Sequence, residues 1–138
     1  MILYLETSNL VKLYVKEGGS DEVKKEVTES DAVATSIISY VEARAAFARK
    51  WREKDFPLDV FETIKADLER DWDRLFVLNL TDALIRAAAA VSEKHGLRGY
   101  DAIHLASALE LKGAVTAPVR FSSSDEKLCE AARAEGLG

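Results

Sequence analysis

The chain has 138 residues, 48% of them hydrophobic and 31% charged, with only 7 glycines and 2 prolines. This length and composition predict one globular domain, residues 1–138, and exclude a disordered or low-complexity chain. The single cysteine, Cys129, excludes an internal disulfide and a cysteine-rich zinc site, and no stretch approaches the roughly 20 apolar residues of a membrane span. The net charge of −5 argues against a generally basic, nucleic-acid-binding surface. We expect a cytoplasmic protein without a membrane segment.

Short apolar runs alternate with longer stretches of helical periodicity, which is the pattern of an α/β domain with a parallel sheet. The first strand is expected at 2–5, and Ser8 begins a helix that ends at the glycine pair of positions 18 and 19. Ser20 is expected to cap the next helix. The later elements follow in chain order: a strand at 32–35, helices at about 39–54 and 58–72, a strand at 74–80, helices at 82–95 and from 99 onward, a strand at 119–122 and a helix at about 125–136.

Four carboxylates stand at informative positions in this pattern. Glu6 directly follows the first strand, at the edge of an open α/β sheet where ligands bind. Glu42 shares a helix face with apolar residues, and Asp101 lies in the first turn of the most apolar helix. Asp125 follows the last strand, again at a strand-to-helix junction. The pattern therefore directs four acids toward the core or toward the ligand-binding edge of the sheet.

Each acid alone also has a structural explanation. Asp101 and Asp125 suit helix caps or partners of the helix dipole, and Glu42 suits a pairing with Arg44, Arg49 or a neighbouring chain. Glu6 is harder to explain, because a carboxylate that ends a buried strand needs a partner and no basic residue is close in sequence. If the four acids converge, their repulsion calls for a divalent cation, and oxygen ligands favour Mg²⁺ or Mn²⁺. Such a site activates water for attack on a phosphodiester.

The residues around these acids have two readings each. The hydroxyls of Ser8, Ser123 and Ser124 suit water or phosphate contacts and helix caps equally well. His104, three residues after Asp101, is expected to be a packed core histidine rather than a catalytic base. Seven basic residues could contact phosphate, although a solvated helix face explains most of them: Lys12, Lys16, Arg44, Arg49, Lys50, Arg52 and Lys54.

Four segments in this order resemble the signature blocks of the PIN-domain family, and specifically of the VapC toxins: YLETSNLVKLYVKEGGS, SIISYVEARAAFARK, LRGYDAIHLASAL and FSSSDEKLCEAARAEGL. The resemblance implies a three-layer α/β/α fold around a mostly parallel sheet of four to five strands. It also implies an Mg²⁺- or Mn²⁺-dependent endoribonuclease that leaves a 5′-phosphate and a 3′-hydroxyl, forms a homodimer and is inhibited by a VapB antitoxin. The family's acidic catalytic and metal-binding positions fall on Glu6, Glu42, Asp101 and Asp125, and its hydroxyl positions on Ser8 and Ser123.

The chain departs from this resemblance in two places. The family normally has aspartate where this chain has Glu6, and the added methylene moves the carboxylate by about a bond length or more. Because Mg²⁺ demands near-ideal octahedral geometry, three explanations of Glu6 stay open: a natural variant, a change that attenuates activity, or a deliberate substitution that lets a toxic protein be expressed. The alternative function is a catalytically weakened PIN-fold module that binds a protein partner. The family also commonly continues with one more strand after AEGL, where this chain ends at Gly138.

Overall fold

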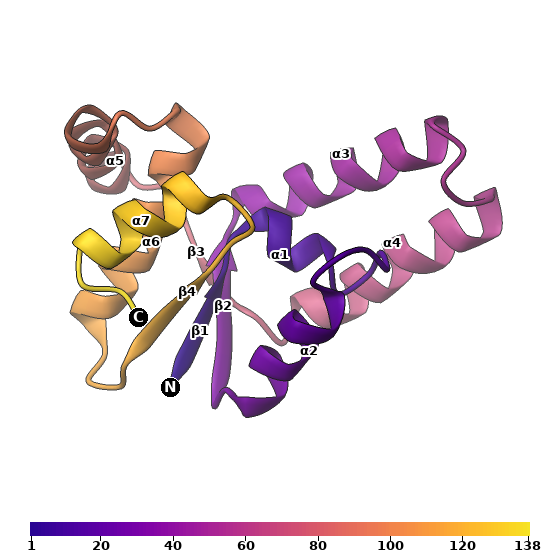
Figure 1. Cartoon of the computed structure of the whole chain (residues 1–138), viewed down its shortest axis with the longest axis horizontal. Helices are drawn as coiled ribbons and strands as arrows, with labels where there is room; N and C mark the ends of the chain where they lie inside the picture. The colour runs from indigo at the N-terminus through magenta and orange to yellow at the C-terminus, as the bar shows by residue number, and fades with distance from the viewer.

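A computed structural model describes all residues, 1–138, as four strands and seven helices (Figure 1). The elements follow one another as β1 (Ile2–Leu5), α1 (Thr7–Val11), α2 (Ser20–Glu29), β2 (Ala32–Ser36), α3 (Ile38–Arg52), α4 (Leu58–Trp72), β3 (Phe76–Leu78), α5 (Asp82–His95), α6 (Gly99–Ala114), β4 (Val119–Ser122) and α7 (Glu126–Ala134). The predicted α/β class is confirmed, and so is the predicted order of strands and helices. None of the helices combines the length and the apolar character that a bilayer crossing requires.

Two local predictions near the N-terminus are wrong. The helix expected from Ser8 to position 18 is only α1, because the amides of Leu13 and Tyr14 bond to carbonyls three residues back and tighten the chain into turns. The cap of α2 is Gly19, whose φ of 92° suits glycine, and not Ser20. The Ser20 hydroxyl instead accepts a hydrogen bond from the amide of residue 17 at 3.0 Å and so holds the loop that precedes α2.

The four strands form one fully parallel sheet in the order β3-β2-β1-β4. This confirms the expected parallel sheet at the lower of the two predicted strand numbers. Because all strands run the same way, their carboxyl ends meet at one edge, where α1, α3 and the loop to α7 begin. At the end of the chain, the carbonyl of Gly138 accepts a hydrogen bond from the amide of Phe121 at 3.2 Å, so this residue lies beside β4.

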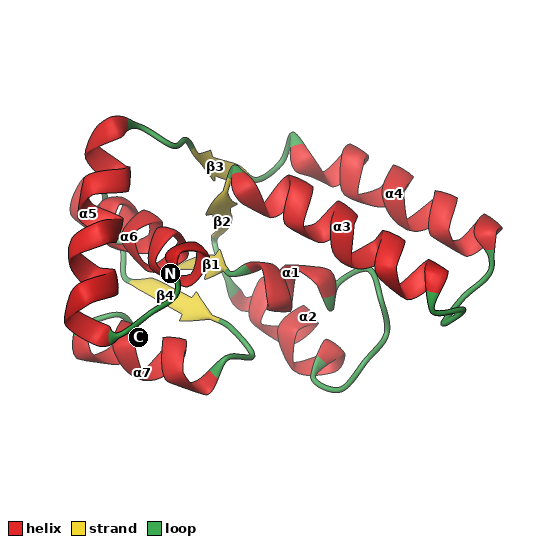
Figure 2. Ribbon diagram, turned by 90° about the horizontal axis from the view of Figure 1, so that it is seen from above, coloured by secondary structure: helices red, strands yellow, loops and turns green.

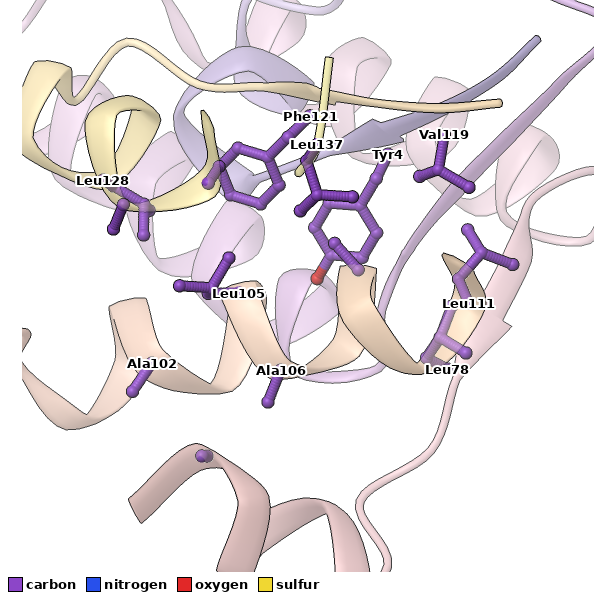
Figure 3. Close-up of a cluster of buried hydrophobic side chains, with 14 of the residues drawn as sticks. Tyr4, Leu78, Ala102, Leu105, Ala106, Leu111, Val119, Phe121, Leu128 and Leu137 are labelled. Carbon is purple, nitrogen blue, oxygen red and sulfur yellow. The ribbon is translucent and has the colours of Figure 1, made fainter. Parts of the chain in front are cut away.

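Helices cover both faces of the sheet, as expected for three α/β/α layers. Side chains alternate along β1, so that Tyr4 points to the face covered by α5, α6 and α7, where it stacks on Phe121 at 5.5 Å (Figure 3). Leu105 of α6 packs in the same cluster. Leu3 and Leu5 point to the opposite face, covered by α1 to α4, and are fully buried. Complete burial of such a side chain stabilises the fold by roughly 1.5–3 kcal/mol.

Helices α3 and α4 lie side by side and project away from the sheet as a helical arm (Figures 1 and 2). Aromatic pairs join the two helices at both ends of the arm: Tyr40 meets Trp72 at 5.2 Å, and Trp51 stacks on Phe61 at 4.9 Å. These contacts fix the direction of α3, which carries basic side chains away from the carboxyl edge of the sheet.

Candidate active site

Glu6 directly follows β1 and caps α1 from a buried position, with a relative exposure of 8%. Its Oε1 accepts hydrogen bonds from the hydroxyls of Ser8 and Ser123, both at 2.5 Å, and its Oε2 accepts one from the amide of Ser8 at 3.0 Å. The partners of this buried carboxylate are therefore hydroxyl and amide groups, with no cation among them. Of the three serines named from the sequence, Ser8 and Ser123 contact this carboxylate, whereas the hydroxyl of Ser124 donates to Asn9.

Asp125 lies on the other side of Ser123 and caps α7, where its Oδ1 accepts the amide hydrogen bond of Leu128 at 3.0 Å. Its own amide donates to the hydroxyl of Ser123 at 3.1 Å. Ser123 thus connects Asp125 with Glu6. The helix-cap interpretation of Asp125 is confirmed, and capping leaves its second carboxylate oxygen without a backbone partner.

Asp101 occupies the first turn of α6, where it meets Arg98 at 3.4 Å. Burial raises the pKa of Asp101 above its ordinary value, Arg98 opposes this shift, and the charges of Asp125 and Glu6 add to it. The charges of Asp125 and Glu6 therefore repel that of Asp101 at the carboxyl edge of the sheet. Removal of that repulsion requires a proton or a cation.

Glu42 lies on α3 and has different surroundings. Its Oε1 accepts hydrogen bonds from the hydroxyl of Thr7 at 2.6 Å and from Nε2 of His104 at 2.8 Å. Burial opposes ionisation of Glu42, but the hydrogen bonds from His104 and Thr7 outweigh it and lower its pKa. The expected pairing with an arginine of α3 does not occur, because His104 and Thr7 hold the carboxylate instead.

His104 is the link between Glu42 and the core. It is 1% exposed, and its Nδ1 lies 2.8 Å from the hydroxyl of Tyr4. All groups are satisfied when Tyr4 donates to Nδ1 and the proton on Nε2 points to Glu42. The predicted burial of His104 is confirmed, and its position beneath Glu42 separates it from the solvent. Sequence reasoning did not identify the partners Tyr4 and Thr7.

A cleft of about 890 Å³ connects these acids with basic residues. Glu6, Glu42 and Asp101 line it, and Asp101 also lines an adjoining hollow of about 260 Å³ together with Asp125. The cleft thus brings three of the four predicted acids together, and Asp101 joins the fourth to them.

Arginines form the outer part of the same cleft. Arg49 and Arg52 of α3 line it, and neither has a carboxylate partner. Three other basic candidates have partners: Lys12 and Lys50 pair with Glu17 at 3.6 and 3.2 Å, and Arg44 lies over the ring of Tyr40 at 5.7 Å. Of the seven basic residues named from the sequence, two lie in the cleft with no carboxylate partner.

The donor set has the chemistry of a hard-cation site. It consists of carboxylate and hydroxyl oxygens, which Mg²⁺ and Mn²⁺ prefer, and the mutual repulsion at Asp101 is the kind that a cation relieves. No three histidine, cysteine, aspartate or glutamate side chains, however, approach closely enough to make a complete ligand group. The residues fit a divalent cation by their type and by their shared cleft.

Comparison with known proteins agrees with this architecture. Residues 3–134 match the PIN domain family. The chain is 37% identical over 112 residues to Ribonuclease VapC45 of Mycobacterium tuberculosis, covering 78% of this chain and 75% of that protein. It is 34% identical over 138 residues to Ribonuclease VapC35 of the same species, covering 99% of this chain and 93% of that protein.

Two solved structures share the fold. VapBC2 from Rickettsia felis, bound to a DNA fragment from its promoter, has a TM-score of 0.61 at 14% identity and covers 91% of this chain and 88% of its own. FitAcB from Neisseria gonorrhoeae has a TM-score of 0.66 at 17% identity and covers 96% of this chain and 94% of its own. Since the sequence match spans nearly all of the chain and its similar proteins are VapC ribonucleases, this chain belongs to the PIN domain family as a VapC-type member.

Proposed function

We propose that this chain is a metal-dependent endoribonuclease and the toxin of a VapBC-type toxin-antitoxin pair. The observation that carries the proposal is the cleft in which Glu6, Glu42 and Asp101 lie next to the unpaired Arg49 and Arg52. Acids at the carboxyl edge of a parallel sheet suit a cation, and arginines beside them suit the phosphates of a nucleic acid. The VapC relatives, which are named ribonucleases, support RNA as the substrate.

The proposed metal is Mg²⁺ or Mn²⁺, held by Glu6, Asp101 and Asp125, with Glu42 at the opposite wall of the cleft. When bound, such an ion neutralises the carboxylates and supplies an activated water for phosphodiester hydrolysis. The other groups position this set. Ser8 and Ser123 orient Glu6, and His104 and Thr7 keep Glu42 ionised and fixed.

The proposed partners are a VapB-type antitoxin and a second copy of the chain. The structural neighbour VapBC2 from Rickettsia felis supports the antitoxin, and a basic antitoxin side chain is complementary to the acids of the cleft. Apolar side chains at the edge strand support a dimer: Ile37 and Phe76 are 42% and 58% exposed, and the amide of Ile37 bonds to the end of β3.

The test is cleavage of structured RNAs by the parent, Glu6→Asp and Asp101→Asn, each with Mg²⁺, with Mn²⁺ and with a chelator. We expect metal-dependent cutting by the parent, at least equal cutting by Glu6→Asp, and a loss of roughly 100-fold or more in Asp101→Asn, since one misplaced group costs that much. Product ends should be 5′-phosphate and 3′-hydroxyl. Thermal unfolding of the three proteins checks that Asp101→Asn remains folded.

A second candidate function is a PIN-fold module that only binds a protein partner. The incomplete ligand group around Glu6 favours it. Cutting by Glu6→Asp alone would assign the parent to this class, as a disabled nuclease. If neither the parent nor Glu6→Asp cuts RNA with either metal, the nuclease proposal is overturned.

A further inference from the structure

Tyr100 is the most exposed of the large hydrophobic side chains, at 68%. It directly precedes Asp101 in the first turn of α6 and lines the same cleft as Glu6 and Glu42. Its ring has no aromatic partner in the protein. A tyrosine ring that lies beside a buried acidic site without an aromatic partner is available to a ligand.

The wall of the cleft contributed by α3 leaves room next to this ring. That wall begins with the small side chains of Ala45 and Ala46 and continues with Arg49 and Arg52. Because α3 is straight and rises about 1.5 Å per residue, Arg49 and Arg52 lie progressively farther along the arm. The cleft therefore combines the exposed ring of Tyr100, a surface of two alanines and two arginine side chains in succession along α3.

This combination is the one that an unpaired nucleotide requires. A base stacks on an exposed aromatic ring through its flat face, while arginines contact the phosphates on either side. In a duplex, neighbouring base pairs already cover both faces of each base, so a stacking residue gains nothing there. A basic protein partner would use the acids of the cleft, but it would leave Arg49 and Arg52 without a counter-charge.

We propose that Tyr100 is a base-stacking platform for an unpaired nucleotide of the bound RNA. This inference rests on the proposed ribonuclease function and adds a substrate-binding residue to the cleft. Because Tyr100 and Asp101 line the same cleft, the nucleotide stacked on Tyr100 lies in the RNA segment that passes the carboxylates.

The experiment compares the parent with Tyr100→Phe and Tyr100→Leu. Phenylalanine retains the ring, and leucine retains an apolar side chain without it. Affinity is measured on an unpaired RNA oligonucleotide carrying 2-aminopurine and on the same strand in a duplex, with Ca²⁺ in place of Mg²⁺ to neutralise the carboxylates. Leu58→Ala is the control, since Leu58 is a 54% exposed apolar residue outside the cleft.

We expect Tyr100→Leu to bind the unpaired strand roughly 5- to 100-fold more weakly than the parent and to lose the quenching of 2-aminopurine. Tyr100→Phe and Leu58→Ala should stay within about threefold of the parent. Duplex affinity should be lower than single-strand affinity in the parent and unchanged by Tyr100→Leu.

The two proposals fail in different ways. A parent that cuts RNA, together with a Tyr100→Leu variant of equal affinity for the unpaired strand, overturns the stacking role and leaves the nuclease in place; Tyr100 then belongs to a protein-binding surface. A parent that prefers the duplex likewise overturns the inference. A parent that neither cuts nor binds RNA overturns both.

Discussion

The two acidic ends of the cleft are built differently. Glu6 accepts hydrogen bonds from the hydroxyls of Ser8 and Ser123. Glu42 instead bonds to His104, which in turn bonds to the buried Tyr4. The ionised form of Glu42 is stabilised by the protein alone, since its pKa is lowered. The pKa of Asp101, which lines the cleft with Glu6, is instead raised by burial and by the charges of Asp125 and Glu6. The ionised carboxylate at one end is stabilised by hydrogen bonds within the fold, and the carboxylate at the other end is destabilised by burial and by neighbouring charges.

The strongest way to break this comparison is to remove the anchor of Glu42. His104→Leu removes the hydrogen-bond partner of the Tyr4 hydroxyl and leaves the Glu42 carboxylate with Thr7 alone. We expect the free energy of unfolding to fall by about 3–5 kcal/mol, as for the loss of a buried polar network. Urea denaturation measures this. His95→Gln is the control, because His95 pairs with Glu135 away from the cleft, and it should cost about 1 kcal/mol or less.

The second prediction concerns the Glu6 end of the cleft. Mg²⁺ or Mn²⁺ at 100 times its dissociation constant should stabilise the parent by about 2.7 kcal/mol, because only the folded chain brings the acids together. Thermal unfolding with and without the metal measures it. Asp101→Asn should show a much smaller shift, and Asp59→Asn, on the surface of α4, should respond like the parent. If the metal does not raise the unfolding temperature of the parent, the proposed difference between the Glu6 end and the Glu42 end of the cleft is wrong.

A smaller effect is expected from the hydroxyls around Glu6. Ser123→Ala deletes one hydrogen bond to Glu6 and one acceptor for the amide of Asp125, which should cost about 1–2 kcal/mol. Ser124→Ala is a matched control, since its hydroxyl bonds to Asn9 and not to an acid, and it should cost about 1 kcal/mol. Metal affinity separates the two variants further: only Ser123→Ala should weaken it.

The smallest expected effect is on the pH dependence of the free energy of unfolding. The lowered pKa of Glu42 contributes stability that is present above its unfolded pKa and is lost as the pH falls through its folded pKa. The raised pKa of Asp101 has the opposite sign: ionised Asp101 costs stability at neutral pH, and acid relieves this cost. In metal-free protein, Glu42→Gln should therefore flatten the acid decline in the urea midpoint, and Asp101→Asn should steepen it. Equal profiles would contradict both assignments.

Sequence reasoning located the acids because they occupy strand ends and helix starts, which local patterns reveal. It could not find the contact of Tyr4 and Thr7 with His104, since these residues are about 100 positions apart and meet only through the packing of α6 on β1. A signal was present nonetheless. Tyr4 interrupts an apolar strand with a hydroxyl group, and a buried tyrosine hydroxyl needs a partner. Tyr100 gave no such signal, because exposure depends on the finished surface.

The construction of the helical arm has a consequence for how the molecule opens. Contacts between α3 and α4 join residues near in sequence, while β1 pairs with β4 across more than a hundred positions. Amide hydrogen exchange should therefore be faster along the outer arm, which carries Arg49 and Arg52, than in the sheet that positions Glu6. The arginines and the acids of one cleft thus belong to units of different local stability, and partial opening would displace the arginines before it disturbed the acidic centre.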